Sequence, residues 1–304
     1  MVAPLSTLHG VDPLVAALIS FCPANPATEA HLRAVLEHAV AHPGKLVRAR
    51  LVHTIARHQG LGEDEALQLA CAIEYFHLSS LLLDDLPCMD DAQVRRGEPC
   101  AHRVHGEATT ILAALALINR AYALAGMAFA DQPGFVRVQA HACLDACLGS
   151  SGLVGGQARD LRFRESDLSP REIGRIAVAK TGALFWLAVM LPALAGDPSA
   201  AERRALKALC VYWGLAFQAL DDVRDVLGRT DDTGKTTGRD RALLRPNLAL
   251  ALGVPAVRSR LVRLFLLSEK ALAPLRANGA RWACLTEFQD GFFAAQTAAV
   301  ARAA

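Results

Sequence analysis

The sequence has few aromatic residues, almost no net charge and no long uncharged run. Aromatic side chains make up 6% of the 304 residues, and 32 basic residues nearly balance 30 acidic ones, for a net charge of +2. This balance argues against a protein held to nucleic acid by bulk positive charge, so no nucleic-acid partner is expected. With 53% hydrophobic residues the chain is too apolar for disorder and can bury a sizeable core.

Membrane-spanning and targeting signals are also lacking. The longest stretches without a charged residue, Pro13 to Thr28 and Thr181 to Gly196, have 16 residues each and contain proline. A spanning helix needs about 18–20 apolar residues, so no transmembrane segment is predicted. The first basic residue is Arg33, which leaves no basic leader before it. We therefore expect a cytoplasmic protein.

The eight cysteines form no Cys-x-x-Cys pair, and their scattered positions argue against both a disulfide framework and a zinc site. Cys143 and Cys147 are four residues apart and would share a helix face, which leaves a metal or redox role open for that pair. Reduced cysteines packed in the core are the main expectation.

Apolar residues recur at helical spacing along most of the chain. No alternating strand pattern, repeat or flexible linker interrupts them, so we expect one all-α domain over residues 1–304. The predicted helices cover residues 28–41, 45–59, 63–85, 107–130, 135–150, 169–195, 199–227 and 255–274.

Two acidic clusters stand out in this apolar chain, and each directly follows a hydrophobic run. In the first, Pro87 breaks the helix, and a local bulge would return Asp90 to the face of Asp84. In the second, Asp221 and Asp225 share a helix face, where like charges destabilise the helix unless a cation lies between them. The clusters are Asp84, Asp85, Asp90 and Asp91, and Asp221, Asp222 and Asp225.

Either cluster alone could be a solvated helix end. Together, at the rim of an apolar core, the carboxylates are better explained as ligands of a cation. Oxygen ligands without nearby Cys or His select hard ions, and Mg²⁺ held by few carboxylates usually also binds phosphates.

Basic residues are placed where phosphates could bind. Lys45 and Arg48 open a predicted helix after Gly44, where free backbone N–H groups also favour anions. The others are Arg95 and Arg96 after the first acidic cluster, Lys180 inside an apolar helix, and Lys235 in a polar loop. Each one alone fits a solvated surface, but the combined pattern predicts a multiply anionic substrate bound against apolar helices.

These residues closely resemble the trans-isoprenyl diphosphate synthases of the short-chain, farnesyl/geranylgeranyl type. The matches run in family order from about residue 44 to 240 and include both acidic motifs. The supporting matches are Gly44-Lys45-x-x-Arg48, Glu74-x-x-His77, Arg95-Arg96-Gly97, Gly156-Gln157-x-x-Asp160, Lys180-Thr181-Gly182, Phe217-Gln218 and Gly234-Lys235. Where the family often has Lys-Ser/Thr, this chain has Arg245-Pro246-Asn247, to which we assign no role.

The resemblance implies an isoprenoid synthase fold, a single-domain bundle of long helices around a deep central cavity, usually as a homodimer. It implies head-to-tail condensation of isopentenyl diphosphate with an allylic diphosphate (dimethylallyl, geranyl or farnesyl), with release of diphosphate. A farnesyl diphosphate synthase is the nearest alternative. A class I terpene cyclase would have one diphosphate site and usually an Asn/Ser/Glu second motif. A non-catalytic partner subunit would have lost motif aspartates.

The resemblance also implies the residue roles, around about three Mg²⁺ ions. Direct metal ligands would be Asp84, Asp90 and Asp221, while Asp85, Asp222 and Asp225 would act mostly through metal-bound waters. The allylic diphosphate would be held by Arg95, Lys180 and Lys235, and isopentenyl diphosphate by Lys45, Arg48, His77 and Arg96. The oxygens of Thr181 and Gln218 would face the allylic cation.

Product length follows from the helix before Asp84. In family members that stop at fifteen carbons, the position five before the first aspartate is commonly aromatic, but here it is Ser79, with Ser80 beside it. One turn deeper, Tyr75 and Phe76 are large enough to stop the chain about one isoprene unit later, since a helical turn rises ~5.4 Å. We therefore expect a twenty-carbon product, geranylgeranyl diphosphate.

Overall fold

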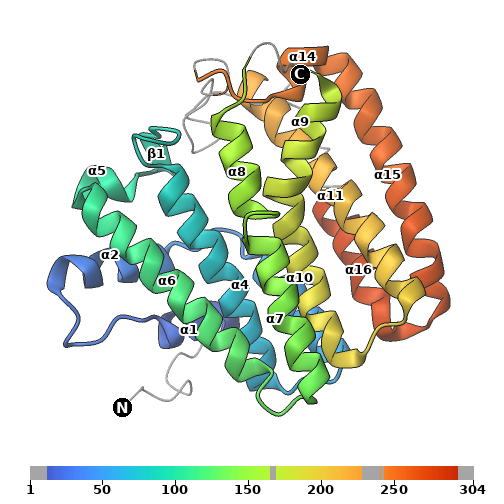
Figure 1. Ribbon diagram of the computed structural model, residues 1–304, viewed down its shortest axis with the longest axis horizontal. Helices are drawn as coiled ribbons and strands as arrows, with labels where there is room; N and C mark the ends of the chain where they lie inside the picture. The colour runs from blue at the N-terminus through green and yellow to red at the C-terminus, as the bar shows by residue number, and fades with distance from the viewer. Residues whose placement is uncertain (1–11, 165–168, 228–239, 241–242, 294–304) are drawn as a thin grey trace. The chain divides into compact units, whose positions relative to one another are not determined.

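The computed structural model describes residues 12–164, 169–227, 240 and 243–293. The described chain is helical apart from one two-stranded sheet and its connections, and it divides into two compact units, Met1–Arg137 and Val138–Ala304 (Figure 1). The single domain and the deep central cavity expected from the sequence stay predictions.

The first unit is built on the long helix α4, which lies beside α6 (Figure 1) and also packs against α3 and α1. Its core includes the fully buried Leu18, Ile55, Tyr75 and Leu117. The elements are α1 (Pro13–Phe21), α2 (Ala30–Ala41), α3 (Val47–His58), α4 (Glu63–Asp84), β1 (Val94–Arg95), β2 (Glu98–Pro99), α5 (Ala101–His105) and α6 (Glu107–Ala128).

Helix α4 begins and ends where its sequence directs. Glu63, Asp64 and Glu65 occupy the first turn, where carboxylates interact favourably with the helix dipole. The middle is apolar on nearly all sides, as expected for a helix covered by neighbours on several faces. The helix ends at Asp84, shortly before Pro87, so the first acidic cluster lies at its C-terminus.

The second unit is organised around α11, which packs against α15, α10 and α14. Trp213 of α11 is fully buried, and its indole N–H donates to Gln289 at 2.9 Å. Helix α7 (Gly134–Leu148) contains the boundary between the units. The other elements are α8 (Leu153–Leu161), α9 (Pro170–Ala177), η3 (Val178–Gly182), α10 (Ala183–Ala193), η4 (Leu194–Gly196), α11 (Ala200–Leu227), α14 (Leu248–Leu252), α15 (Val254–Ala277), η5 (Ala280–Trp282), α16 (Ala283–Phe288) and η6 (Gln289–Phe293).

Glycines allow three segments of the second unit to approach closely. A Cβ on Gly214 of α11 would lie 2.7 Å from the Cα of Gly182 in η3. A Cβ on Gly156 of α8 would lie 2.6 Å from the backbone nitrogen of Lys180. No side chain fits at these distances, so the glycines bring the polar residues of α8, η3 and α11 together.

All eight predicted helices are present, with one change. The helix expected over residues 169–195 contains a π-helical segment, η3, at Val178–Gly182. The sequence interpretation missed the short helices α1, α5, α8, α14 and α16 and the β1–β2 hairpin, in which Val94 pairs with Pro99. Two-residue strands are too short to produce an alternating pattern in the sequence. In the structure the hairpin turns at Arg96 and Gly97, both with positive φ.

Two further expectations concern the cysteines and the absence of a transmembrane segment. All eight cysteines are free thiols, and five are buried, while Cys88 is exposed. By length and composition alone, three stretches could cross a membrane: Glu63–Asp84, Glu107–Ala128 and Pro170–Gly196. The expectation of no transmembrane segment therefore stays a prediction.

Candidate active-site residues

The first acidic cluster forms a backbone bulge after α4. The N–H of Asp90 donates to the carbonyl of Asp84 at 2.9 Å, and the N–H of Ala92 donates to the carbonyl of Asp85 at 3.2 Å. The six-residue step from Asp84 to Asp90 is thus closed into a loop, which brings the two backbones together as the spacing predicted. Asp84 and Asp90 are both half-buried.

Asp85, the second residue of this motif, is buried and held by Arg95 from β1. The Arg95 Nε lies 2.9 Å from both carboxylate oxygens, and Nη2 lies 2.5 Å from Oδ1. A guanidinium has five N–H donors and these bonds use those on Nε and Nη2. Arg95 can therefore hold Asp85 and still present donors to an anion.

A basic cluster lies at the start of α3 and the middle of α4. Arg48 Nη1 lies 3.4 Å from His77 Nε2, and Arg96 Nη1 donates to the carbonyl of His42 at 2.5 Å. Gly44, at φ +75°, passes against the Arg96 side chain, where an added Cβ would lie 2.8 Å from Nε. Lys45 is exposed beside this turn. The predicted isopentenyl diphosphate residues thus share one neighbourhood of the first unit.

Glu74 is the buried counter-charge of the basic cluster. Burial raises its pKa to about 7, although Arg48, Arg96 and a hydrogen bond from the Ala49 N–H lower it. That hydrogen bond also caps α3, whose own N-cap residue Leu46 offers no side-chain acceptor. Burial and the neighbouring arginines lower the pKa of His77 well below its usual range, so its imidazole is neutral at physiological pH.

The four predicted chain-length residues divide into two stripes on α4. Phe76, Ser80 and Asp84 are spaced by four residues and so lie along one stripe. Phe76 packs edge-on against Tyr122 of α6, with ring centroids 5.0 Å apart. Tyr75 and Ser79 form the neighbouring stripe, and the Tyr75 hydroxyl donates to the Leu18 carbonyl of α1 at 2.6 Å. Ser79 is buried, whereas Ser80 is half-buried.

In the second unit, Lys180 is paired with Asp160 of α8. Its Nζ lies 3.1 Å from Oδ2, with the lysine side chain 25% exposed and the aspartate 10% exposed. The Arg245 guanidinium also approaches the Asp160 carbonyl, at 3.5 Å. The predicted diphosphate-binding lysine is therefore oriented by a carboxylate that was matched in the sequence but given no role.

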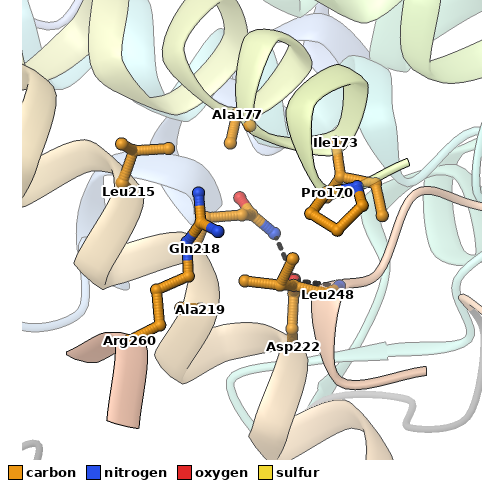
Figure 2. Close-up of a pocket in the computed structure, with 10 residues that line it drawn as sticks. Pro170, Ile173, Ala177, Leu215, Gln218, Ala219, Asp222, Leu248 and Arg260 are labelled. Atoms are coloured by element: carbon orange, nitrogen blue, oxygen red, sulfur yellow. Dashed lines mark hydrogen bonds between the residues drawn. The ribbon is translucent and has the colours of Figure 1, made fainter. Parts of the chain in front are cut away.

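A hydrogen-bonded chain connects η3 to the second acidic motif. The Thr181 hydroxyl donates to Gln218 Oε1 at 2.8 Å, and Gln218 Nε2 donates to Asp222 Oδ1 at 2.8 Å. The Leu248 N–H donates to Asp222 Oδ2 at 2.7 Å. An apolar pocket bordered by Ile173 and Leu215 lies beside this chain (Figure 2).

Asp222 differs from the aspartates beside it. Its residue is 1% exposed, and burial raises its pKa to about 8 despite the hydrogen bonds from Leu248 and Gln218. Asp221 is half-buried and Asp225 is buried on the same helix α11. Lys235 lies outside the described residues.

The carboxylates suit Mg²⁺ shared with a diphosphate. Among the residues that the structure describes, no three His, Cys, Asp or Glu side chains form a complete metal cage. Mg²⁺ seldom needs one, because it is usually held by one or two carboxylates together with substrate phosphates. Both oxygens of Asp85 and of Asp222 already accept protein hydrogen bonds, which fits carboxylates that would act through metal-bound water.

Sequence reasoning missed the functional contacts of Glu74, Asp160 and Asn247. The first two stood inside matched motifs, so the signal existed without a role attached to it. Asn247 directly precedes Leu-Ala-Leu-Ala-Leu, the pattern of an N-cap residue, and its side chain does cap α14. Its contact with the second acidic motif is a tertiary feature that no local pattern encodes.

Comparison with known proteins agrees with these motifs. A family model described as polyprenyl synthetase matches residues 29–259. The geranylgeranyl diphosphate synthase of Pseudescherichia vulneris is 39% identical over 229 residues, 74% of this chain and 72% of that protein. The farnesyl diphosphate synthase of Geobacillus stearothermophilus is 33% identical over 261 residues, 85% of this chain and 87% of its own.

A solved structure shares the fold. The geranyltransferase of Helicobacter pylori, complexed with magnesium and isoprenyl diphosphate, superposes with a TM-score of 0.78 at 24% identity, covering 93% of this chain and 98% of its own. The all-α isoprenoid synthase fold and the resemblance to short-chain trans-isoprenyl diphosphate synthases, which are prenyltransferases, are thereby confirmed. This chain belongs to the polyprenyl synthetase family.

Proposed function

We propose that the chain condenses isopentenyl diphosphate head-to-tail with an allylic diphosphate and makes mainly geranylgeranyl diphosphate. The observation that carries the proposal is the cluster of Arg48, His77 and Arg96, built around buried Glu74. This cluster offers an anion site of its own. Its residues are not the ones that hold Asp85 and Asp222 in the acidic motifs. A cyclase, which binds a single diphosphate, has no use for it.

The chain's residues have distinct parts in the reaction. Arg95 and Lys180 neutralise charge that develops on the leaving diphosphate as the allylic C–O bond breaks. Mg²⁺, when bound by the acidic motifs, supplies further charge neutralisation as a Lewis acid. The oxygens of Thr181 and Gln218, fixed by their mutual hydrogen bond, present negative dipoles to the allylic cation.

The bond-forming step needs no protein nucleophile. The double bond of isopentenyl diphosphate attacks the allylic cation, and the resulting cation loses a proton to the released diphosphate. Apolar helix walls exclude water, which would otherwise capture the cation. His77, neutral because its pKa is lowered, serves as a polar contact for the diphosphate of isopentenyl diphosphate and not as the base.

The twenty-carbon length is supported by the stripe from Asp84 through Ser80 to Phe76. Ser80 has a small side chain, and its hydroxyl is turned along the helix, where it donates to the His77 carbonyl at 2.8 Å. Phe76, a further turn away, is fixed against Tyr122 and is the first large group on this stripe. The geranylgeranyl diphosphate synthases among the relatives favour the same product.

Product analysis tests the function directly. The full chain with MgCl₂ and isopentenyl diphosphate is incubated with dimethylallyl, geranyl or farnesyl diphosphate, and diphosphate release and product mass are measured. We expect a twenty-carbon prenyl diphosphate from each primer. A fifteen-carbon product would contradict the length and leave the synthase. Absence of diphosphate release would indicate a non-catalytic subunit, and turnover of one prenyl diphosphate alone to a hydrocarbon would indicate a cyclase.

The proposal includes about three Mg²⁺ ions at the two acidic motifs, a cytoplasmic location and a homodimer. Support for the homodimer comes from α6, which leaves several large apolar side chains exposed on the surface of the chain. Its residues Ile111, Leu112 and Leu115 are exposed on one face, and an apolar patch of this kind marks an association surface.

Light scattering tests the dimer. Leu112→Glu combined with Leu115→Glu is expected to halve the mass of the particle in solution. Leu266→Glu, at a residue 61% exposed on α15, serves as the matched control and should leave the mass unchanged. Association through α6 would be contradicted if the wild type is a monomer, or if the double variant is still a dimer.

A further inference from the structure

Asn247 uses both ends of its amide in a fully buried position, 0% exposed. Its Oδ1 accepts the N–H groups of Ala249 at 2.9 Å and Leu250 at 3.0 Å, which caps α14. Its Nδ2 donates to the Asp240 carboxylate at 2.8 Å and to the Asp222 backbone carbonyl at 3.3 Å. The cap accounts for only half of these contacts.

The neighbouring residue completes a grip on Asp222. The Leu248 N–H donates to Asp222 Oδ2 at 2.7 Å, so the turn at 247–248 contacts both the backbone and the carboxylate of Asp222. The other carboxylate oxygen accepts from Gln218, which in turn accepts from Thr181. A shift of this turn would therefore move Asp222, and with it the Gln218 amide that is proposed to face the allylic cation.

The same segment also reaches the lysine that would hold the leaving group. The Arg245 N–H donates to the Asp240 carbonyl at 2.8 Å, and the Arg245 guanidinium approaches the carbonyl of Asp160, whose carboxylate pairs with Lys180. Residues 245–248 thus contact the supports of both Asp222 and Lys180 within the second unit. An asparagine suits this place because serine or threonine could cap the helix but could not also donate to two acceptors.

We propose that Asn247 is a positioning residue that fixes Asp222 of the second acidic motif for binding of Mg²⁺ and diphosphate. The inference rests on the proposed function and gives the Arg245-Pro246-Asn247 segment a role. Groups that orient metal-binding residues from outside the metal's own shell typically contribute 10–100-fold to metal affinity or activity.

Two substitutions separate positioning from capping. Asn247→Ser keeps an acceptor for α14 and loses the donor to Asp222 and Asp240, whereas Asn247→Ala loses both. A matched control is Ser169→Ala, which removes the N-cap of α9, where the Ser169 hydroxyl accepts the Glu172 N–H at 3.2 Å. That residue caps a helix of the same unit without contacting the acidic motif.

The experiment uses the full chain and inorganic diphosphate. Thermal shift is measured while MgCl₂ is titrated at fixed diphosphate, and kcat and the KM for isopentenyl diphosphate are measured in parallel. For Asn247→Ser we expect a Tm without ligands lowered by a few degrees, because two acceptors lose their donor, a MgCl₂ midpoint raised by at least about tenfold, a kcat lowered to a similar extent and an unchanged KM for isopentenyl diphosphate. Asn247→Ala should raise the midpoint similarly and lower the Tm further, because the helix cap is lost as well.

The possible outcomes separate a failure of the positioning role of Asn247 from a failure of the proposed function. A wild-type chain stabilised by Mg²⁺ and diphosphate, with Asn247→Ser matching it in midpoint and kcat, would overturn the positioning role and leave the synthase. A midpoint shifted equally by Ser169→Ala would overturn it as well, because general destabilisation would then be the cause. A wild-type chain that gains no stability from Mg²⁺ and diphosphate would overturn the proposed function and this inference together.

Discussion

The two acidic motifs fix their second aspartates by opposite means. Asp85 of the first unit is held by a charged fork, the Arg95 guanidinium. Asp222 of the second unit is held by neutral donors, the Gln218 amide and the Leu248 N–H. A buried carboxylate can thus be oriented either by pairing its charge or by hydrogen bonds alone.

Both aspartates are buried, Asp85 at 5% exposure, so the difference lies in the partners that reach them. The Arg95 side chain is 28% exposed, so its charge keeps part of its hydration while it pairs with Asp85. Asp222 is 1% exposed, and a second buried charge beside it would carry a large desolvation cost. Neutral donors avoid that cost, but no cation among the described residues pairs with the carboxylate, and burial raises the Asp222 pKa to about 8.

The largest expected effect tests whether both motifs serve the reaction. Asp84→Ala and Asp221→Ala should each lower turnover on the order of 10²–10³-fold, because each removes a carboxylate predicted to bind metal opposite the leaving group. Steady-state rates at saturating MgCl₂ measure this. Asp131→Asn is the control, since it removes an exposed carboxylate that belongs to neither acidic motif. Near-normal turnover in either alanine variant would refute the metal assignment.

Removing the charged donor of Asp85 and a neutral donor of Asp222 should lower the free energy of unfolding by different amounts. Arg95→Met leaves the buried Asp85 charge without its partner, and the free energy of unfolding should fall by about 3 kcal/mol. Gln218→Met removes one neutral donor from Asp222 and should cost about 1 kcal/mol. Urea unfolding of both variants gives the comparison. Equal losses of free energy would show that the charged and the neutral donors contribute alike, and would contradict this comparison.

Much of this architecture was predictable from local sequence. Long apolar periodicity defined α4, α6 and α11, and the step from Asp84 to Asp90 predicted the bulge that the Asp90 N–H closes. Residue types and order were enough to place the acidic and basic groups in one family, as the matched region of residues 29–259 confirms. Individual site roles stay predictions.

What escaped prediction depends on tertiary contacts. No local pattern shows that Arg95 faces Asp85, that Asp160 pairs with Lys180, or that Asn247 reaches Asp222 across 25 residues of sequence. The π-helical segment η3 was also missed. It contains Gly182, which lies against Gly214 of another helix, a contact that local sequence does not show. Hydrophobic periodicity reports which face is buried and not which partner buries it.

Glu74 extends the comparison to pH. Its pKa rises from 4.5 to about 7 in the fold because of burial, so the folded chain binds this proton more tightly than the unfolded chain. Stability associated with the protonated group is therefore complete below pH 4.5 and is lost as the pH rises through about 7. Glu74→Gln keeps an oxygen for the Ala49 N–H and cannot ionise.

The stability of Glu74→Gln relative to wild type should accordingly increase between pH 5 and pH 8, by a few kcal/mol at most. Thermal unfolding of both proteins across this range measures the difference. A constant difference would mean that Glu74 titrates alike in the folded and unfolded chains, and that the arginines fully compensate its burial.

A smaller effect concerns the basic cluster. Lys45→Ala and Arg48→Ala should each raise the KM for isopentenyl diphosphate about tenfold, a loss of about 1.4 kcal/mol, and leave the KM for the allylic substrate unchanged. Arg50→Ala is the matched control, because Arg50 lies on the same helix α3 and pairs with Asp12 on the exposed surface. Equal weakening of both substrates would contradict separate sites, and the same weakening by Arg50→Ala would indicate a general charge effect.

The smallest expected change in free energy is one of product length. Phe76 and Ser80 lie on the stripe of Asp84, whereas Tyr75 and Ser79 lie on the neighbouring one, and Tyr75 is anchored to α1 by its hydroxyl. Phe76→Ala should therefore lengthen the product by about one isoprene unit, since that unit spans roughly one helical turn of ~5.4 Å. Ser80→Phe should shorten it to farnesyl diphosphate, more completely than Ser79→Phe.

Tyr75→Phe, which loses a single buried hydrogen bond, should lower stability by about 1 kcal/mol and keep the product unchanged. Mass analysis of the products decides between the stripes. Lengthening by Tyr75→Ala but not by Phe76→Ala would place the floor of the chain-binding site on the other stripe.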